Sequence, residues 1–110
     1  MEFVNLTPHP IVIYKGGRKI REIPPSGKVL RLPEERNPMG EVDGIPVSHL
    51  RYGVPNELPP QTEDTIYIVS MLVLLALKGK RSDLVAPDTG AGAVRDENGR
   101  IIGTKGFVKV

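Results

Sequence analysis

Polar residues around two apolar runs, between residues 65 and 93, have types and spacing that suit anion binding. Residues 65–69 are β-branched and aromatic and predict a strand, Ser70 is a favoured helix N-cap, and residues 84–86 predict a second strand. If the strands are parallel, the helix start and the loop after residue 86 meet at one edge of the sheet, where ligands of parallel sheets bind. Unpaired N–H groups at the helix start, beginning with Met71, together with the Ser70 hydroxyl then form an anion site.

The loop at 87–93 brings further groups to this predicted site. The side chains of Asp88 and Thr89 could hydrogen-bond to ribose hydroxyls, and that of Arg95 to a phosphate. Gly90 has no side chain and lets a ligand approach the backbone. The alternative is an ordinary turn in which Ser70 caps the helix and the small residues are present for their conformation. The glycines are neither a Walker loop nor a dinucleotide fingerprint, because no Gly-Lys-Ser/Thr follows and they come after the second strand.

A second candidate is the polar row Asn5, Thr7 and His9 near the start of the chain. Alternate residues of an extended segment share one face, so the three side chains could read a base or sugar edge. The alternative, which we favour, is that Asn5 and Thr7 satisfy backbone groups around Pro8 and Pro10 while His9 lies on the surface.

The remaining ionisable residues do not follow the spacing of a known metal or catalytic motif. No HExxH, EF-hand or GxSxG pattern is present, so we expect no metal and no cofactor. The sequence therefore favours a binding protein over an enzyme. Two catalytic pairs stay open as alternatives: Ser70 with His9 for nucleophilic catalysis, and Asp88 with Asp96 for acid or base catalysis. Asp96 is also typical of a solvated hairpin tip. The metal candidates considered were His9, His49, Asp83, Asp88, Asp96 and Glu97.

Composition excludes several classes of function. The 110 residues carry no cysteine, a net charge of +2 and five aromatic side chains without tryptophan, so neither a disulfide scaffold nor nucleic-acid binding is expected. The longest apolar run, residues 71–77, is far shorter than the ~20 residues that span a bilayer. The start of the chain does not read as a signal peptide. We therefore expect a single domain over residues 1–110, cytoplasmic, without membrane contact.

The expected fold is α+β: a mostly antiparallel sheet or partial barrel of short strands with one buried apolar helix at about residues 70–79. The helix is apolar on all sides, which predicts burial, and so small a chain should form a homo-oligomer to cover it. Hairpin turns are predicted at Gly16-Gly17 and Asn98-Gly99. The other expected strands are residues 3–6, 11–14, 19–23, 28–32, 45–52, 94–97, 100–102 and 107–110, with a surface loop and candidate lid at 33–44.

Motifs along nearly the whole chain resemble those of a family of small uncharacterised bacterial and bacteriophage proteins. The matching stretches are NLTPHPIVIY, IPPSG, GIPV, YG, TIYIVS, RSDLVAPDTG and VRDENGRIIG. The resemblance implies a compact stand-alone domain and a setting that includes phage genomes. Polar positions within these stretches are Asn5, Thr7, His9, Ser70, Arg81, Asp83, Arg95 and Asp96.

The sequence thus favours a non-enzymatic binder of a small molecule that contains phosphate and ribose. One concrete version, by analogy with other small phage proteins, is a sponge that sequesters an immune signalling nucleotide. The alternatives are a small nucleotide-processing enzyme that uses His9 or Asp88 as base, and an interaction module that blocks a host factor through the apolar helix or an open strand edge.

Overall fold

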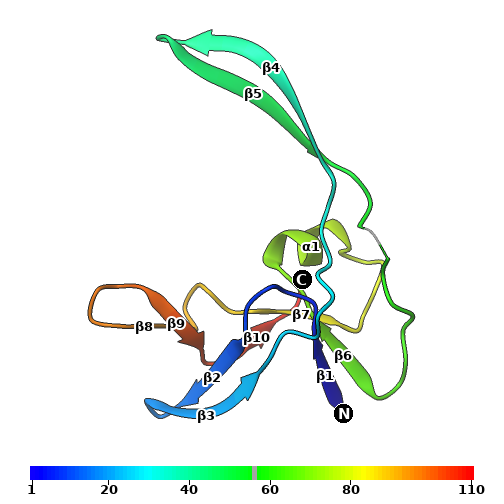
Figure 1. The fold of residues 1–110 in the computed structure, drawn as a ribbon, viewed down its shortest axis with the longest axis vertical. Helices are drawn as coiled ribbons and strands as arrows, with labels where there is room; N and C mark the ends of the chain where they lie inside the picture. The colour runs from blue at the N-terminus through cyan, green and yellow to red at the C-terminus, as the bar shows by residue number, and fades with distance from the viewer. Residues whose placement is uncertain (56) are drawn as a thin grey trace.

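The computed structural model describes residues 1–55 and 57–110 and arranges them as a layered body with one long projecting arm (Figure 1). The elements in chain order are β1 (Glu2–Asn5), β2 (Ile11–Lys15), β3 (Arg18–Ile23), β4 (Glu34–Val42), β5 (Ile45–Tyr52), β6 (Thr65–Ile68), α1 (Met71–Ala76), β7 (Leu84–Pro87), β8 (Ala93–Arg95), β9 (Ile101–Thr104) and β10 (Phe107–Val108).

The first sheet has the strand order β1-β6-β7-β10. Strands β1, β6 and β7 are parallel, α1 connects β6 to β7, and β10 is antiparallel to β7. The predicted parallel strand–helix–strand unit is therefore confirmed. Both faces of this sheet are covered, because Tyr67 and Val69 pack against α1 while Ile66 and Ile68 point to the opposite side.

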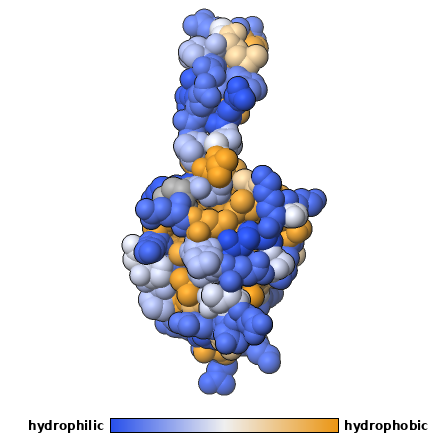
Figure 2. Space-filling model, turned by 90° about the vertical axis from the view of Figure 1, so that its right-hand side faces the viewer, coloured by the Kyte–Doolittle hydropathy of each residue, from blue (hydrophilic) through white to orange (hydrophobic). Residues whose placement is uncertain are grey.

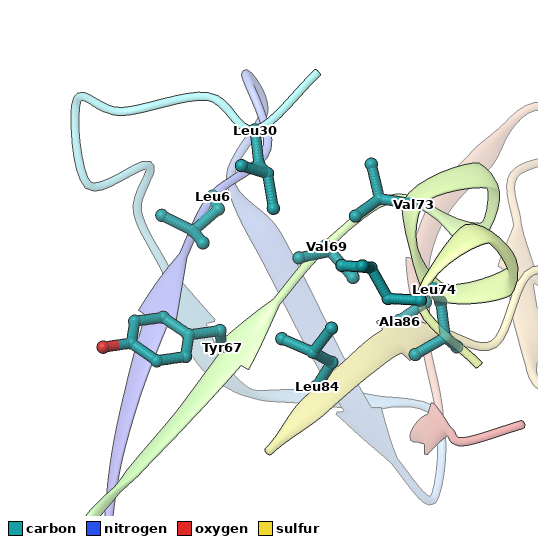
Figure 3. Packing of buried hydrophobic residues seen from close by; sticks show 9 residues of the cluster. Leu6, Leu30, Tyr67, Val69, Val73, Leu74, Leu84 and Ala86 are labelled. Carbon is teal, nitrogen blue, oxygen red and sulfur yellow. The ribbon is translucent and has the colours of Figure 1, made fainter. Parts of the chain in front are cut away.

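The main core lies between the first sheet and α1 (Figure 3). Tyr67 of β6 and buried leucines and valines of α1 and β7 meet Leu6 and Leu30 there, and Val69 and Ala86 are completely buried. A second core, made of Ile11, Ile23, Ile68 and Val85, fills the space on the other side. The body thus has three layers: α1, the first sheet and a second sheet.

The second sheet has the order β3-β2-β9-β8 and is built from the two predicted hairpins. Gly16 and Gly17 have φ of 59° and 76° between β2 and β3, and Gly99 has φ of 80° between β8 and β9, which confirms both turns. Strands β2 and β9 pair in parallel.

Strands β4 and β5 form a two-stranded hairpin, called the arm below (residues 34–52), that leaves the body (Figure 1). Its strands pair from Glu34 and Tyr52 at the base to Val42 and Ile45 at the tip, and every arm residue is exposed. The radius of gyration is 16.5 Å, whereas a compact domain of this length has ~13 Å. The arm accounts for this extended shape.

The expected α+β class is confirmed, but two of its details are wrong. The sheets are mixed rather than mostly antiparallel, and the strands of the described residues do not close into a barrel. The helix is shorter than expected and only half buried, since Met71, Leu72 and Leu75 remain 37%, 44% and 53% exposed. A helix that packs on one sheet buries one side, and no other described element covers the opposite one.

Two segments adopt structures other than those expected from their sequence. Residues 28–32 are not a strand; the Leu30 N–H instead donates to the Leu6 carbonyl at 3.0 Å. Residues 34–42, expected to be a loop or lid, are strand β4, with a bulge near Pro38. Charges and prolines obscured this strand because neither of its faces is buried, so no apolar alternation was required.

No helix within residues 1–55 and 57–110 is long and apolar enough to cross a membrane.

Candidate functional site

Asn5 and Thr7, predicted as possible ligand-binding residues, are turned toward the protein's own backbone. The Asn5 amide nitrogen donates to the carbonyls of His9 (2.8 Å) and Ile23 (3.2 Å), and its oxygen accepts from the Thr7 N–H (2.9 Å). Both side chains are buried. This is the arrangement of the favoured alternative, in which the two residues satisfy the corner around the prolines.

Ser70 and Met71 begin α1 as predicted, but Ser70 acts as a helix cap. Its hydroxyl accepts the Val73 N–H at 3.3 Å. A groove of about 250 Å³ lies beside Ser70, between Thr7 and the arm base at Tyr52. Thr89 does not line this groove, so the helix start and the glycine loop do not share one binding site.

Asp88 and Gly90 hold the loop after β7 in shape. The Asp88 carboxylate accepts the Gly90 N–H at 2.9 Å, and a Cβ on Gly92 would lie 2.6 Å from the same carboxylate. The buried Thr104 hydroxyl lies 2.8 Å from the carbonyl oxygens of both Asp88 and Gly106. Sequence analysis did not single out Thr104, which ties this loop to β9.

Arg95 lies on the β8–β9 hairpin, away from the helix start. Its guanidinium donates to the Gly99 carbonyl at 2.7 Å across the turn. Asp96 accepts the N–H groups of Asn98 (2.9 Å) and Arg100 (3.0 Å). These contacts are those of a solvated hairpin tip, the alternative given above for Asp96.

Of the predicted ligand-binding residues, His9 and Thr89 come together in one shallow groove of about 310 Å³. Its walls are mainly apolar, with Ile101 and Ile102 exposed beside Gly103. The groove offers a surface for an apolar group, but it carries no fixed charge among its lining residues.

Another groove lies at the C-terminal end of α1 and has a volume of about 420 Å³. This site is called the basic groove below. Buried Leu74, Leu77 and Leu84 line its apolar part. Its polar lining comes from Gln61, Lys78, Lys80, Arg81, Ser82 and Lys109, and no described residue that lines it is acidic.

The turn that follows α1 positions two of these cations. The helix ends at the C-cap Leu77, and Gly79 adopts φ of 78°, a left-handed conformation common after a helix end. Lys78 and Lys80 flank this glycine on the surface, and neither ammonium group has a hydrogen-bond acceptor among residues 1–55 and 57–110. Their donors are therefore available to a ligand.

Arg81 lines one side of the basic groove and is held in place by the buried Asp83. The Arg81 guanidinium donates two hydrogen bonds to the buried Asp83 carboxylate (2.8 and 2.7 Å) and a third to the Pro59 carbonyl (2.8 Å). The hydrogen bond that Arg81 donates to Asp83 raises the pKa of Arg81, with a smaller opposing effect of burial. Arg81 thus holds the loop at Pro59 in place.

The other polar lining residues are oriented by Ser82. The Gln61 amide donates to the Ser82 hydroxyl at 2.9 Å, and the Lys109 ammonium donates to the Ser82 carbonyl at 2.7 Å. Lys109 comes from the end of the chain, so three separate segments build the groove.

The cluster Lys78-Gly79-Lys80-Arg81 comes after the end of α1, whose last turn contains no basic residue. The signal that identifies the groove is the return of Lys109 to this cluster, which depends on the pairing of β10 with β7. That pairing was not evident from the sequence.

Among the described residues, no group of three or more His, Asp or Glu side chains is placed to hold a metal ion. Comparison of the chain with models of protein families, with curated proteins and with solved structures finds no match.

Proposed function

We propose that the protein binds a phosphate-bearing small molecule of nucleotide type in the basic groove, without transforming it. The observation that carries this proposal is the pair of unpartnered ammonium groups, Lys78 and Lys80, beside a groove with no acidic lining residue among those described. Such a site attracts an anion over a distance and binds it through charge-assisted hydrogen bonds.

The apolar lining supports a ligand with a flat or apolar part beside its charge. Leu74, Leu77 and Leu84 provide a surface for a base, while the lysines lie at the polar side. The volume of about 420 Å³ falls within the ~300–1,000 Å³ typical of small-molecule sites.

The charge of the groove supports binding rather than turnover. The charged side chains that line it are three lysines and Arg81, whose pKa is raised by its hydrogen bonds to Asp83. Phosphate contacts from cations hold a ligand but do not by themselves provide a general base. A site with this chemistry would sequester a nucleotide, including an immune signalling nucleotide in a phage setting.

The direct test is mass spectrometry of small molecules released by denaturing the purified protein, followed by thermal unfolding with linear nucleotides, cyclic nucleotides and inorganic phosphate. A ligand of the folded state raises the melting temperature as its concentration exceeds the dissociation constant. The matched variants are Lys80→Glu in the groove and Lys105→Glu, an exposed lysine outside it.

We expect at least one nucleotide to stabilise the parent protein and the Lys105→Glu variant, and Lys80→Glu to lose most of that effect. Chromatography of the incubated nucleotide should recover it unchanged. If a nucleotide stabilises Lys80→Glu as much as the parent, the ligand binds outside the basic groove. If no nucleotide stabilises the parent, the proposal is refuted. Recovery of a converted nucleotide would instead favour the enzymatic alternative.

A further inference from the structure

The arm is a hairpin with little support from its own body. Among residues 1–55 and 57–110 its two strands pair with each other alone, and all its residues from Glu34 to Tyr52 are exposed. An isolated two-stranded hairpin is at best marginally stable in water and needs a third strand or an apolar partner surface. The arm therefore requires a surface supplied by another molecule.

The tip of the arm carries the apolar surface suited to such a contact. Val42 and Ile45 are opposite each other at the last pair of the ladder and are 63% and 66% exposed. Val47 is on the same face, two residues from Ile45 along β5. Figure 2 shows this apolar tip at the end of a mostly hydrophilic arm.

The outer face of α1 is a matching surface on the body. Met71, Leu72 and Leu75 are exposed there, and Lys78 follows the helix end, with its N–H donating to the Leu75 carbonyl at 3.3 Å. Glu41 and Asp43 flank the apolar tip of the arm. Each surface thus combines apolar side chains with charge of opposite sign.

Charge complementarity identifies a second copy of this chain as the partner. The arm contains four acidic and two basic residues, whereas the rest of the chain contains nine acidic and 13 basic residues. Two arm tips packed against each other would bring Glu41 and Asp43 of both copies together, whereas a tip packed on the body brings opposite charges together.

The geometry allows this contact between two copies but not within one. The tip lies about 27 Å from the arm base, at ~3.4 Å per residue, and the arm points away from the body (Figure 1). The arm base, at Glu34 and Tyr52, lines the same groove as Ser70 and Leu72 of the α1 region. A second arm that runs antiparallel beside the first would therefore bring its own tip back to α1.

We propose that two copies of the protein exchange arms, with the tip of each arm packed on the α1 face of the other. The arrangement is a two-fold dimer in which the same two surfaces are used twice, so the assembly is closed. It places Val42 and Ile45 of one copy against Leu72 and Leu75 of its partner, with Lys78 near the acidic tip. Lys78 also lines the basic groove, but the dimer contact does not require a ligand there.

The test combines sedimentation of full-length variants with pairwise cross-linking. Ile45→Glu at the tip and Leu75→Glu on α1 place a charge in the proposed contact, and Ile20→Glu places the same charge on an exposed isoleucine of β3. We expect the parent and Ile20→Glu to sediment as dimers. Each contact variant should weaken the dimer by at least about tenfold, as expected of a central apolar contact, while keeping the circular dichroism spectrum of the parent.

The chain has no cysteine, so single-cysteine variants report which surfaces meet. A mixture of Ile45→Cys and Leu75→Cys proteins should form a disulfide-linked dimer of the two variants under mild oxidation. A parent that stays monomeric at high concentration would overturn the proposal, as would a dimer unaffected by both glutamates. Cross-linking of Ile45→Cys only to itself would show a tip-to-tip contact instead and would equally refute it.

Discussion

The Asn5 carboxamide oxygen lies 2.9 Å from the Thr7 backbone nitrogen and 2.7 Å from the Thr7 hydroxyl, so one side chain closes the corner between β1 and β2. These two strands belong to different sheets. Asn5 also reaches the Ile23 carbonyl at the end of β3. A buried side chain thus joins the edge of the first sheet to the second sheet through hydrogen bonds.

We predict that Asn5→Ala lowers the free energy of unfolding by about 2–4 kcal/mol, because the Ile23 carbonyl and the Thr7 N–H lose their hydrogen bonds to Asn5 and the His9 carbonyl keeps only the one from the Thr7 hydroxyl. Thr7→Val, which keeps the shape and removes only the hydroxyl, should cost about 1 kcal/mol. Urea unfolding of the purified variants measures both values. Equal, small losses would contradict the structural role given to Asn5.

The sequence predicted this corner correctly because the evidence for it is local. Two prolines exclude regular pairing, and short polar side chains commonly bond to neighbouring backbone groups. The Gly16-Gly17 and Asn98-Gly99 turns and the unit from β6 to β7 were predictable for the same reason. The mixed character of the sheets was not, since the parallel pairing of β1 with β6 and of β2 with β9 joins segments far apart in sequence.

The pair Arg81 and Asp83 provides a second stability prediction. Asp83 is 4% exposed and the Arg81 side chain 14%, so Arg81→Met leaves a buried carboxylate without its cation. We expect a loss of about 2–4 kcal/mol in the free energy of unfolding. The double variant Arg81→Met with Asp83→Leu should recover much of the loss, because it removes the unpaired charge as well.

The same pair makes a pH prediction. The hydrogen bond with Asp83 raises the pKa of Arg81 above its ordinary value. The resulting stabilisation is complete below the pKa of the unfolded state and is lost only as pH rises through the higher pKa of the folded state. Between about pH 8 and 11 the stability difference between the parent and Arg81→Met should therefore stay constant. A difference that shrinks within this range would contradict the assignment.

A substitution of Ser70 distinguishes two locations for the ligand: the start of α1, as expected from the sequence, and the basic groove. Ser70→Ala removes the acceptor of the Val73 N–H and should cost about 1 kcal/mol, as for other helix N-caps. The increase in melting temperature produced by a bound nucleotide should remain, because Ser70 does not line the basic groove. Thermal unfolding with and without nucleotide measures both effects. Loss of the increase in melting temperature would show that the ligand binds at the start of α1.

The candidate site was predictable only in part. Side chains beside one another in sequence, such as Asp88 and Gly90, do contact each other, but they stabilise a loop. The cations of the basic groove come from the turn after α1 and from β10's end, and only the pairing of β10 with β7 brings Lys109 to Lys78 and Lys80. A short sequence motif cannot encode that juxtaposition.

Removal of the arm separates ligand binding from self-association. The Gly53 N–H donates to the Pro33 carbonyl at 2.8 Å across the arm base, so a short Gly-Ser linker can replace residues 34–52 without moving these ends. Because no arm residue belongs to either buried core, we expect the free energy of unfolding to change by about 1 kcal/mol or less. Sedimentation should show a monomer, and nucleotides should still raise its melting temperature. A monomer that no longer responds to a nucleotide that stabilises the parent would mean that the ligand site needs the partner's arm, and an arm-free dimer would mean that α1 is covered in another way.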